Sequence, residues 1–525
     1  MQSVLLYDTT LRDGTQREGM SLSSEDKLKI ARELDRLGVH YIEGGWPGSN
    51  PKDAEFFRRV RELGLKHARI SAFGSTRHAT NTCDTDPNIR ALVEAETPVV
   101  TLVGKSSVLH VEHVLETSLD ENLRMIADSV AYFKMLGKEV VYDAEHFFDG
   151  YKLDSEYALE TLIAAARAGA DTLCLCDTNG GSLPEEVALA VRTVRQALSE
   201  ADAPMPSIGI HTHNDGALAV ANAMAAIRAG AGHVQGTING YGERCGNMDL
   251  IPLIANLQLK MGYHCLEAEQ LRRLSEVSAF VAAVANLNPD THAPYVGRSA
   301  FAHKGGIHVA AVAKLPASYQ HIDPELVGNE LRVVVSELAG RGNVRMRAES
   351  LGLELNGNER TVLQRIKELE SQGFQFEAAE GSFEMLVRRA SPDYTPPFTL
   401  LDFTVIIEAR GDNPLKSQAI VKVQISDDVM HTAAEGDGPV NALDQAIRKA
   451  LLPHYPLLKN VSLVDYKVRI VDEHLGTAAK PRVLIETACG DERWSTVGCS
   501  ENIVEASWQA LWDSLELPLL RARDS

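Results

Sequence analysis

Apolar and polar positions alternate in a regular rhythm through the first half of the chain. Short apolar runs, such as 4–7 and 139–142, are each followed by a longer segment whose apolar residues recur at helical spacing. The segment 23–38 is typical of these helices, because a serine opens it, acidic residues follow and a glycine ends it. We expect eight such strand-then-helix units.

The eight units predict an α/β fold with a (β/α)8 TIM barrel over residues 1–265. The alternation by itself also fits a doubly wound open sheet. We favour the barrel, because polar clusters recur at the carboxyl ends of so many of the predicted strands.

Beyond the barrel the pattern becomes irregular and then strand-rich. Helices at 266–285 and 361–373 lie between glycine- and histidine-rich loops, and the segment 393–399 is a proline-rich boundary. Four segments after it alternate like half-buried strands, at 400–409, 418–426, 466–475 and 482–490. Helices at 438–452 and 502–516 follow the strand groups. We therefore expect a helical linker region at 266–395 and a C-terminal α+β domain at 396–525, built from two similar units.

Composition narrows the class of protein. With 52 basic and 72 acidic side chains the formal charge is −20, which argues against a nucleic-acid or anionic-membrane surface. No basic leader precedes an apolar run, and no apolar stretch approaches the length of a membrane helix. Seven thinly spread cysteines do not form a disulfide framework. We expect a soluble cytoplasmic protein, in which Cys174 and Cys176 are buried apolar residues of a strand rather than a metal pair.

The polar clusters at the strand ends carry the candidate chemistry, because catalytic groups of TIM barrels project there. His211 and His213 share one face of a strand, since side chains repeat every two residues. With Asp13 they would form a three-ligand site for a divalent metal (Mg²⁺, Mn²⁺ or Zn²⁺) that leaves positions open for substrate. Asn247 is a fourth or outer oxygen donor. The alternative is that both histidines are structural, hydrogen-bonded residues.

Arg12 precedes Asp13, and the two could form a simple salt bridge. If the strand continued through them they would point to opposite sides and would pair poorly. A guanidinium at a strand end beside a metal is suited to stabilising an alkoxide that develops from a ketone.

Several motifs in order resemble one family over essentially the whole chain. The segments 6–16 (LYDTTLRDGTQ), 211–215 (HTHND), 239–247 (NGYGERCGN), 299–311 (SAFAHKGGIHVAA), 436–446 and 494–511 resemble the isopropylmalate/homocitrate/citramalate synthase family of metal-dependent TIM barrels. The segments 17–53 and 143–152 resemble most closely its citramalate synthase branch. That branch condenses acetyl-CoA with pyruvate in a route to isoleucine. A sister 2-oxo-acid synthase, a metal-dependent lyase or aldolase, and a non-catalytic amino-acid sensor are the alternatives.

The resemblance implies a role for each matching residue. The metal ligands would be Asp13, His211 and His213, with Asn247 in or near the shell. Arg12 would contact the keto oxygen, Thr178 would hold the substrate carboxylate, and Glu145 would lie beside the substrate. His308 would be the base for acetyl-CoA, with Tyr319 assisting it. In this family the last two reach the barrel of the partner subunit, which implies a homodimer with a shared active site. The C-terminal domain would bind a branched-chain amino acid, isoleucine first, as a feedback effector.

Each of these residues could instead have a purely structural role. His308 could cap a helix, Tyr319 could pack, and Glu145 could pair with a neighbouring cation. We expect Glu243 and Arg244 to pair within the glycine-rich loop. The wall of the oxo-acid pocket is expected near Leu102, Asp143 and Thr178, where single methyl groups decide the choice of substrate.

Overall fold

The computed structural model describes residues 2–336, 339–409, 415–471, 476, 479–490 and 492–524. Its contacts group them into two compact units. The first runs to Phe301 and includes Ile322–Leu331, and the second takes Ala302–His321 and the chain from Arg332 onward. The functional division at residues 265 and 395 stays a prediction.

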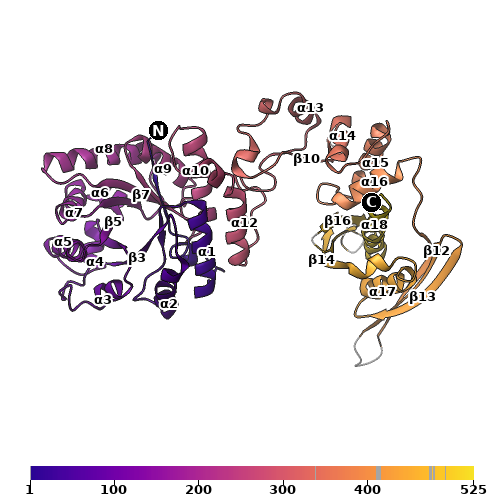
Figure 1. Ribbon diagram of the computed structural model, residues 1–525, viewed down its shortest axis with the longest axis horizontal. Coiled ribbons are helices and arrows are strands. Elements are labelled where there is room, and N and C mark those ends of the chain that lie inside the picture. The colour runs from indigo at the N-terminus through magenta and orange to yellow at the C-terminus, as the bar shows by residue number, and fades with distance from the viewer. Residues whose placement is uncertain are drawn as a thin grey trace. The chain divides into compact units, whose positions relative to one another are not determined.

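Eight parallel strands close into a barrel in the order of the sequence, and the first pairs with the last (Figure 1). The strands are β1 (Leu5–Asp8), β2 (Tyr41–Glu43), β3 (Arg69–Ser75), β4 (Val99–Lys105), β5 (Glu139–Glu145), β6 (Thr172–Asp177), β7 (Ser207–Thr212) and β8 (His233–Gly236). The closed ring confirms the predicted TIM barrel and contradicts the open-sheet alternative.

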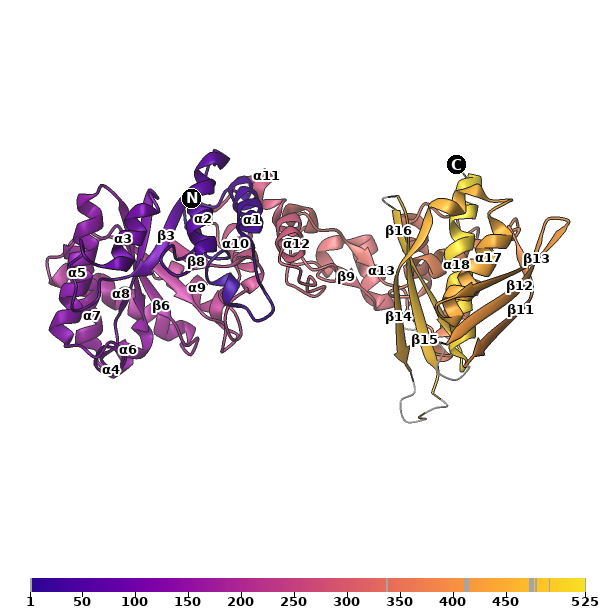
Figure 2. The ribbon, with the colours of Figure 1, turned by 90° about the horizontal axis from the view of Figure 1, so that it is seen from below.

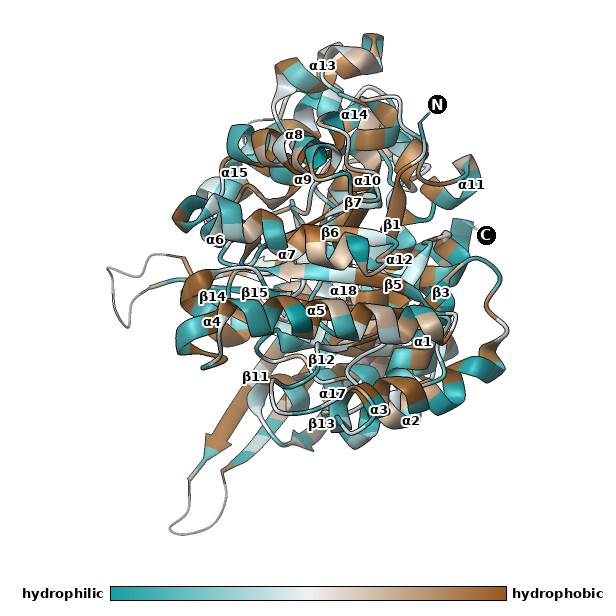
Figure 3. Cartoon of the chain, turned by 90° about the vertical axis from the view of Figure 1, so that its left-hand side faces the viewer, coloured by the Kyte–Doolittle hydropathy of each residue, from teal (hydrophilic) through white to brown (hydrophobic). Residues whose placement is uncertain are grey.

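Amphipathic helices surround the barrel, with apolar and polar positions mixed along each (Figure 3). They are α1 (Ser24–Leu37), α2 (Pro51–Val60), α3 (Pro87–Glu94), α4 (Val108–His113), α5 (Leu119–Met135), α6 (Phe147–Leu153), α7 (Ser155–Arg167), α8 (Pro184–Glu200), α9 (Ala219–Arg228), α10 (Leu250–Leu259), α11 (Ala268–Leu271) and α12 (Leu274–Val284). A capping box between Ser23 and Asp26 starts α1, and Gly38 ends it in the left-handed region at φ 95°. Among the described residues, no helix is both long and apolar enough to cross a membrane.

The interior of the barrel is filled by side chains from alternate strand positions. Cys174 and Cys176 belong to a cluster of buried side chains and are buried, as predicted. Their sulfur atoms and a carboxylate oxygen of Asp143 lie within 4.8 Å of one another. Burial raises the pKa of the Cys174 thiol well above its ordinary value, which favours the protonated, apolar form over a metal-binding thiolate.

The second unit begins with a helical region and ends in two sheets. Its elements are β9 (Ala302–His303), α13 (Gly306–Lys314), β10 (Arg332–Val333), α14 (Arg341–Ser350), α15 (Glu359–Ser371), α16 (Glu380–Arg389), β11 (Thr399–Glu408), β12 (Lys416–Ile425), β13 (Asp428–Gly436), α17 (Pro439–Leu451), β14 (Val461–Ile470), β15 (Pro481–Cys489), β16 (Glu492–Cys499) and α18 (Ile503–Asp524). Residues 472–475 of one predicted strand lie outside the described residues.

The two sheets, β11–β12–β13 and β14–β15–β16, are antiparallel, and α17 and α18 lie between them (Figure 2). This confirms the predicted C-terminal α+β fold of two similar units, each closed by a helix. The sequence did not predict β13 and β16. Both lack long aliphatic alternation, and pairing to the central strands β12 and β15 holds them in the sheets.

Candidate active site

The chain turns sharply after β1, and this turn brings Arg12 and Asp13 together. The Asp8 carboxylate accepts hydrogen bonds from the backbone N–H and hydroxyl of Thr10, at 2.9 and 2.8 Å. Arg12 Nη1 donates to Asp13 Oδ1 at 2.5 Å. The strand ends at Asp8, so the condition under which these neighbours would pair poorly is not met, and the salt bridge that the sequence left open forms.

The guanidinium of Arg12 is held on three sides. Its Nε donates to Glu43 Oε1 at 2.5 Å, and its central carbon lies 3.8 Å from the centre of the Phe73 ring. Glu43, fully buried at the end of β2, also accepts from the Tyr7 hydroxyl at 2.6 Å. Glu43 was not among the residues predicted from the sequence, although an acidic residue at a predicted strand end was a signal for it.

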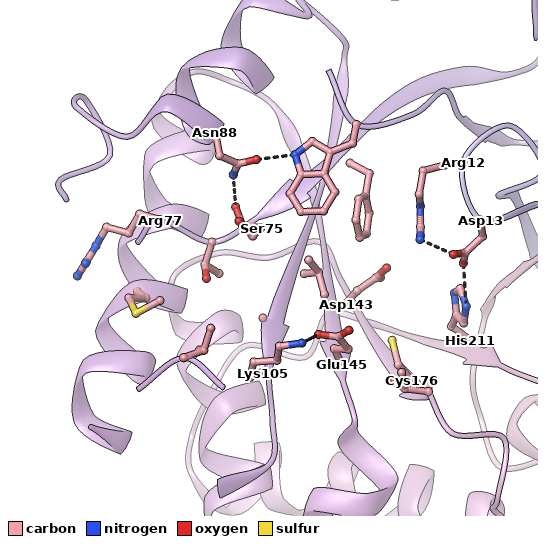
Figure 4. Close-up of a pocket in the computed structure, with 18 of the residues that line it drawn as sticks. Arg12, Asp13, Ser75, Arg77, Asn88, Lys105, Asp143, Glu145, Cys176 and His211 are labelled. Atoms are coloured by element: carbon pink, nitrogen blue, oxygen red, sulfur yellow. Dashed lines mark hydrogen bonds and ion pairs between the residues drawn. The ribbon is translucent and has the colours of Figure 1, made fainter. Parts of the chain in front are cut away.

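The structure brings the three predicted metal ligands together. One ligand atom from each of Asp13, His211 and His213 lies within 4.8 Å of the others. His211 Nε2 is 3.2 Å from Asp13 Oδ2, and the His211 and His213 rings are 5.2 Å apart. Figure 4 shows Asp13 between Arg12 and His211. Asn247, on the loop after β8, donates from Nδ2 to Asp13 Oδ2 at 2.9 Å.

The charges around this cluster favour cation binding. Burial alone would raise the pKa of Asp13, but Arg12 and His211 hold it well below its usual range, so the carboxylate is ionised. Burial and the neighbouring His211 lower the pKa of His213 to about 3, so this imidazole is neutral. Burial opposes protonation of His211, yet Asp13 raises its pKa, so a cation entering the site competes with a proton there.

Two buried polar atoms lack partners near the cluster, and one of them belongs to a predicted metal ligand. The Nδ1 atom of His213 and the Oδ1 atom of Asn247 have no hydrogen-bond partner among the described residues. Asn247 pairs with His213 through an isolated antiparallel bridge, which keeps the two side chains near each other. Buried atoms of this kind normally have partners. The nitrogen and carboxylate donors of Asp13, His211 and His213, with the unsatisfied Nδ1 of His213 among them, are therefore suited to a divalent metal.

The cluster opens into a cavity of about 730 Å³, lined by residues of the first unit. Thr178 and Glu145 both line it, as predicted. The Thr178 hydroxyl accepts from the backbone N–H of His146 at 2.8 Å, which leaves its proton free for a substrate oxygen. Glu145 pairs with Lys105 (Figure 4), so the expectation of a neighbouring cation is also correct. Asp143 lines the cavity, whereas Leu102 is not part of the lining.

Arg244 connects the glycine-rich loop after β8 to the segments that follow β6 and β7. It lies 3.5 Å from Glu243, the predicted partner, but its closer ion pair is with Asp215 at 2.8 Å. It also donates to the backbone carbonyl of Thr178 at 2.8 Å. The cation therefore fixes the position of Thr178 at the cavity wall.

His308 and Tyr319 belong to the second unit. His308 lies in the first turn of α13 without capping it, and its ring stacks on that of Tyr319 with centroids 4.3 Å apart. Both side chains are exposed. The contact supports a common role for the two rings, and their catalytic role stays a prediction.

Comparison with known families agrees with the fold. Three family models match successive parts of the chain: HMGL-like over residues 3–279, homocitrate synthase post-HMGL domain-like over 295–373, and LeuA allosteric (dimerisation) domain over 377–518. The first model covers the barrel and the predicted ligands.

Curated relatives match over nearly full length. An (R)-citramalate synthase of Synechocystis sp. is 53% identical over 98% of this chain and 96% of its own, and one of Geobacter sulfurreducens is 51% identical over 100% and 99%. A 2-isopropylmalate synthase of Shouchella clausii is 30% identical over 97% and 95%. The chain therefore belongs to the HMGL-like family and, within it, to the (R)-citramalate synthases.

Proposed function

We propose that this protein condenses acetyl-CoA with pyruvate and hydrolyses the product to (R)-citramalate and CoA. The methyl carbon of the acetyl group bonds to C2 of pyruvate, whose keto oxygen becomes a hydroxyl. Water then supplies a hydroxyl to the acyl carbon and a proton to the leaving sulfur. The observation that carries the proposal is the 53% identity to an (R)-citramalate synthase along 98% of the chain.

Arg12 is placed to bind the keto oxygen. Its salt bridges to Asp13 and Glu43 use Nη1 and Nε, so Nη2 has no protein contact of this kind in the described structure. A donor fixed before reaction stabilises the negative charge that develops on this oxygen without reorganising. Thr178 offers its hydroxyl proton to the pyruvate carboxylate, and Glu145 lies on the neighbouring part of the wall.

Asp13, His211 and His213 would hold the metal, and Asn247 lies beside them with its Nδ2 next to Asp13 Oδ2 and His211 Nε2. A divalent metal bound there would polarise the ketone of the oxo acid. His308 takes a proton from the acetyl methyl group, a very weak acid that needs a well-placed base, and Tyr319 orients the ring of His308 by stacking. A cytoplasmic location and a place in isoleucine synthesis belong to this proposal as well.

CoA release tests the function directly. The purified protein is given acetyl-CoA with pyruvate, 2-oxobutyrate, 2-oxoisovalerate or 2-oxoglutarate, and free thiol is followed with and without a chelator. We expect release to be fastest with pyruvate, by at least about 10- to 200-fold over 2-oxoisovalerate, because one extra methylene in a pocket changes discrimination by about this factor and 2-oxoisovalerate has two more carbons than pyruvate. Chelator is expected to abolish release, and added Mn²⁺ to restore it.

Two outcomes would contradict parts of the proposal. A preference for a longer oxo acid would keep the chemistry and assign a sister synthase activity. No release with any oxo acid would reject the condensation, and the lyase and sensor alternatives would then be tested.

The C-terminal domain is proposed to bind isoleucine and to slow the barrel of a homodimer. The similarity to a LeuA allosteric (dimerisation) domain supports an allosteric role and a dimer, and isoleucine is the effector that the family resemblance implies. The glycine-rich turns at 436–439 and 498–502 are candidates for the effector pocket, and they occupy equivalent places, because each joins a third strand to its closing helix. A Cβ atom at Gly498 would lie 1.9 Å from the Ala506 carbonyl oxygen, so this glycine also serves helix packing.

Adding amino acids to the full-length protein tests the effector. Millimolar isoleucine is expected to lower CoA release by about fivefold or more, a typical coupling between distant sites. Alanine at the same concentration is the control. An unchanged rate and an unchanged melting temperature with isoleucine, leucine and valine would refute this part.

A further inference from the structure

A buried chain of hydrogen bonds runs from His211 on β7 through Gln235 on β8 to Asp143 on β5. The Nδ1 atom of His211 lies 2.7 Å from Gln235 Oε1, and Gln235 Nε2 donates to Asp143 Oδ1 at 2.8 Å. Gln235 stands opposite His211 in the register of β7 and β8, whereas Asp143 lies on β5, so the second bond crosses the interior. Their exposed fractions are 5% for His211, 0% for Gln235 and 3% for Asp143. Water therefore has little access to replace these bonds.

The donor and acceptor groups of these side chains define which atom carries the proton in each hydrogen bond. Gln235 turns its amide NH₂ group toward Asp143 and its carbonyl oxygen toward His211, which is the arrangement that a carboxylate at residue 143 requires, because a carboxylate only accepts hydrogen bonds. An acceptor facing Nδ1 requires that this nitrogen carry the proton. The lone pair of the neutral imidazole is then on Nε2, the atom that faces Asp13. Burial raises the pKa of Asp143 to about 7, but the carbonyl oxygen of the protonated acid accepts the same bond.

We propose that Gln235, oriented by Asp143, is a positioning residue that sets the tautomer and ring angle of His211 for metal binding. Hydrogen bonds to the second nitrogen of a ligating histidine commonly play this part in metal sites. Neither residue touches the proposed ligand atoms directly, so both act through His211. The inference rests on the metal site of the proposed function, but not on the choice of oxo acid.

Titration of the metal-free, full-length protein with Mn²⁺ in a calorimeter tests the proposal without any assay of activity. Gln235→Met keeps the length of the side chain but neither donates nor accepts strongly. We expect it to weaken Mn²⁺ binding by about 10- to 100-fold. Gln258→Met is the matched control, because Gln258 also donates and accepts hydrogen bonds in the same barrel but holds the 265–266 turn instead.

An exchange of acid and amide separates positioning from mere support of the fold. Gln235→Glu alone brings two carboxyl groups together, and it is expected to weaken Mn²⁺ binding at a pH where both are ionised, because Asp143 then cannot donate to the new carboxylate. In the double variant Asp143→Asn/Gln235→Glu, the amide of residue 143 donates to the new carboxylate, which still accepts from His211 Nδ1. The direction of the chain is thus restored, and Mn²⁺ affinity is expected to return to within about tenfold of the unmodified protein.

The outcomes are distinct. Unchanged Mn²⁺ affinity in Gln235→Met, with a melting temperature that shows a folded protein, would overturn the proposal. If Gln235→Met does not fold, a double variant that binds Mn²⁺ no better than Gln235→Glu would overturn it. If the affinities follow the expected pattern while the unmodified protein releases no CoA with pyruvate, the proposed substrate fails and the positioning role of Gln235 holds.

Discussion

Replacing Arg12 by alanine is expected to lower kcat for CoA release with pyruvate by about 10²–10³-fold, the usual cost of removing one preorganised donor to a developing oxyanion. The guanidinium is held by Asp13, Glu43 and the Phe73 ring, so its remaining nitrogen is fixed in direction before substrate arrives. Arg12→Lys should lose nearly as much, because a single ammonium group cannot make two directed salt bridges and still reach the substrate.

Two measurements separate this effect from loss of the fold. Arg12→Ala leaves the buried Glu43 without its cation, which costs about 3–5 kcal/mol of stability, so the melting temperature should fall in that variant. Mn²⁺ affinity, in contrast, should not fall, because Asp13 keeps its charge and loses a competing cation. Arg17→Ala, on the exposed continuation of the same loop, is the matched control. A kcat within twofold of the unmodified protein in Arg12→Ala would reject the proposed role.

Replacing His308 by alanine is expected to lower kcat by about 10²–10⁴-fold, the range for loss of a general base. The side chain is exposed and lies in a helix of the second unit, so its removal should leave the melting temperature and Mn²⁺ affinity unchanged. His431→Ala, an exposed histidine of the same unit on β13, is the control.

Mixing the two inactive variants tests whether the site is shared between subunits. After the Arg12→Ala and His308→Ala proteins exchange subunits, half of the dimers are mixed, and each has one intact combination of Arg12 and His308. About a quarter of the original rate should return if the dimer shares its sites symmetrically. No recovery, with subunit exchange shown by differently labelled chains, would place both groups within one subunit.

Much of the fold was predictable because it follows from local patterns. The barrel strands carry near-continuous apolar runs, and helices such as α1 begin and end at residues with clear capping signals. The strands that the sequence missed, β13 and β16, have no such pattern of their own. They are strands because β12 and β15 present backbone donors and acceptors to them.

The candidate site was predictable to the extent that its residues sit at strand ends. His211 follows from the spacing of two histidines in a strand, and Asp13 from a polar cluster after another. The sequence left the salt bridge between Arg12 and Asp13 open, since the exact end of β1 decides whether neighbouring side chains diverge. Glu43 and Gln235 gave only weak signals, because one buried polar residue in a strand says nothing about its partner.

The sequence alone determined that strands and helices alternate through the first half of the chain, which strand ends carry polar groups, and which family it resembles. Those properties depend on the order and spacing of residues along the chain. Only the tertiary structure decided that Glu43 holds Arg12 and that Asp143 reaches Gln235 across the barrel, 92 residues away. Closure of the strands into a ring brings such residues within hydrogen-bond distance, and burial then makes each unpaired polar atom costly enough to fix its partner.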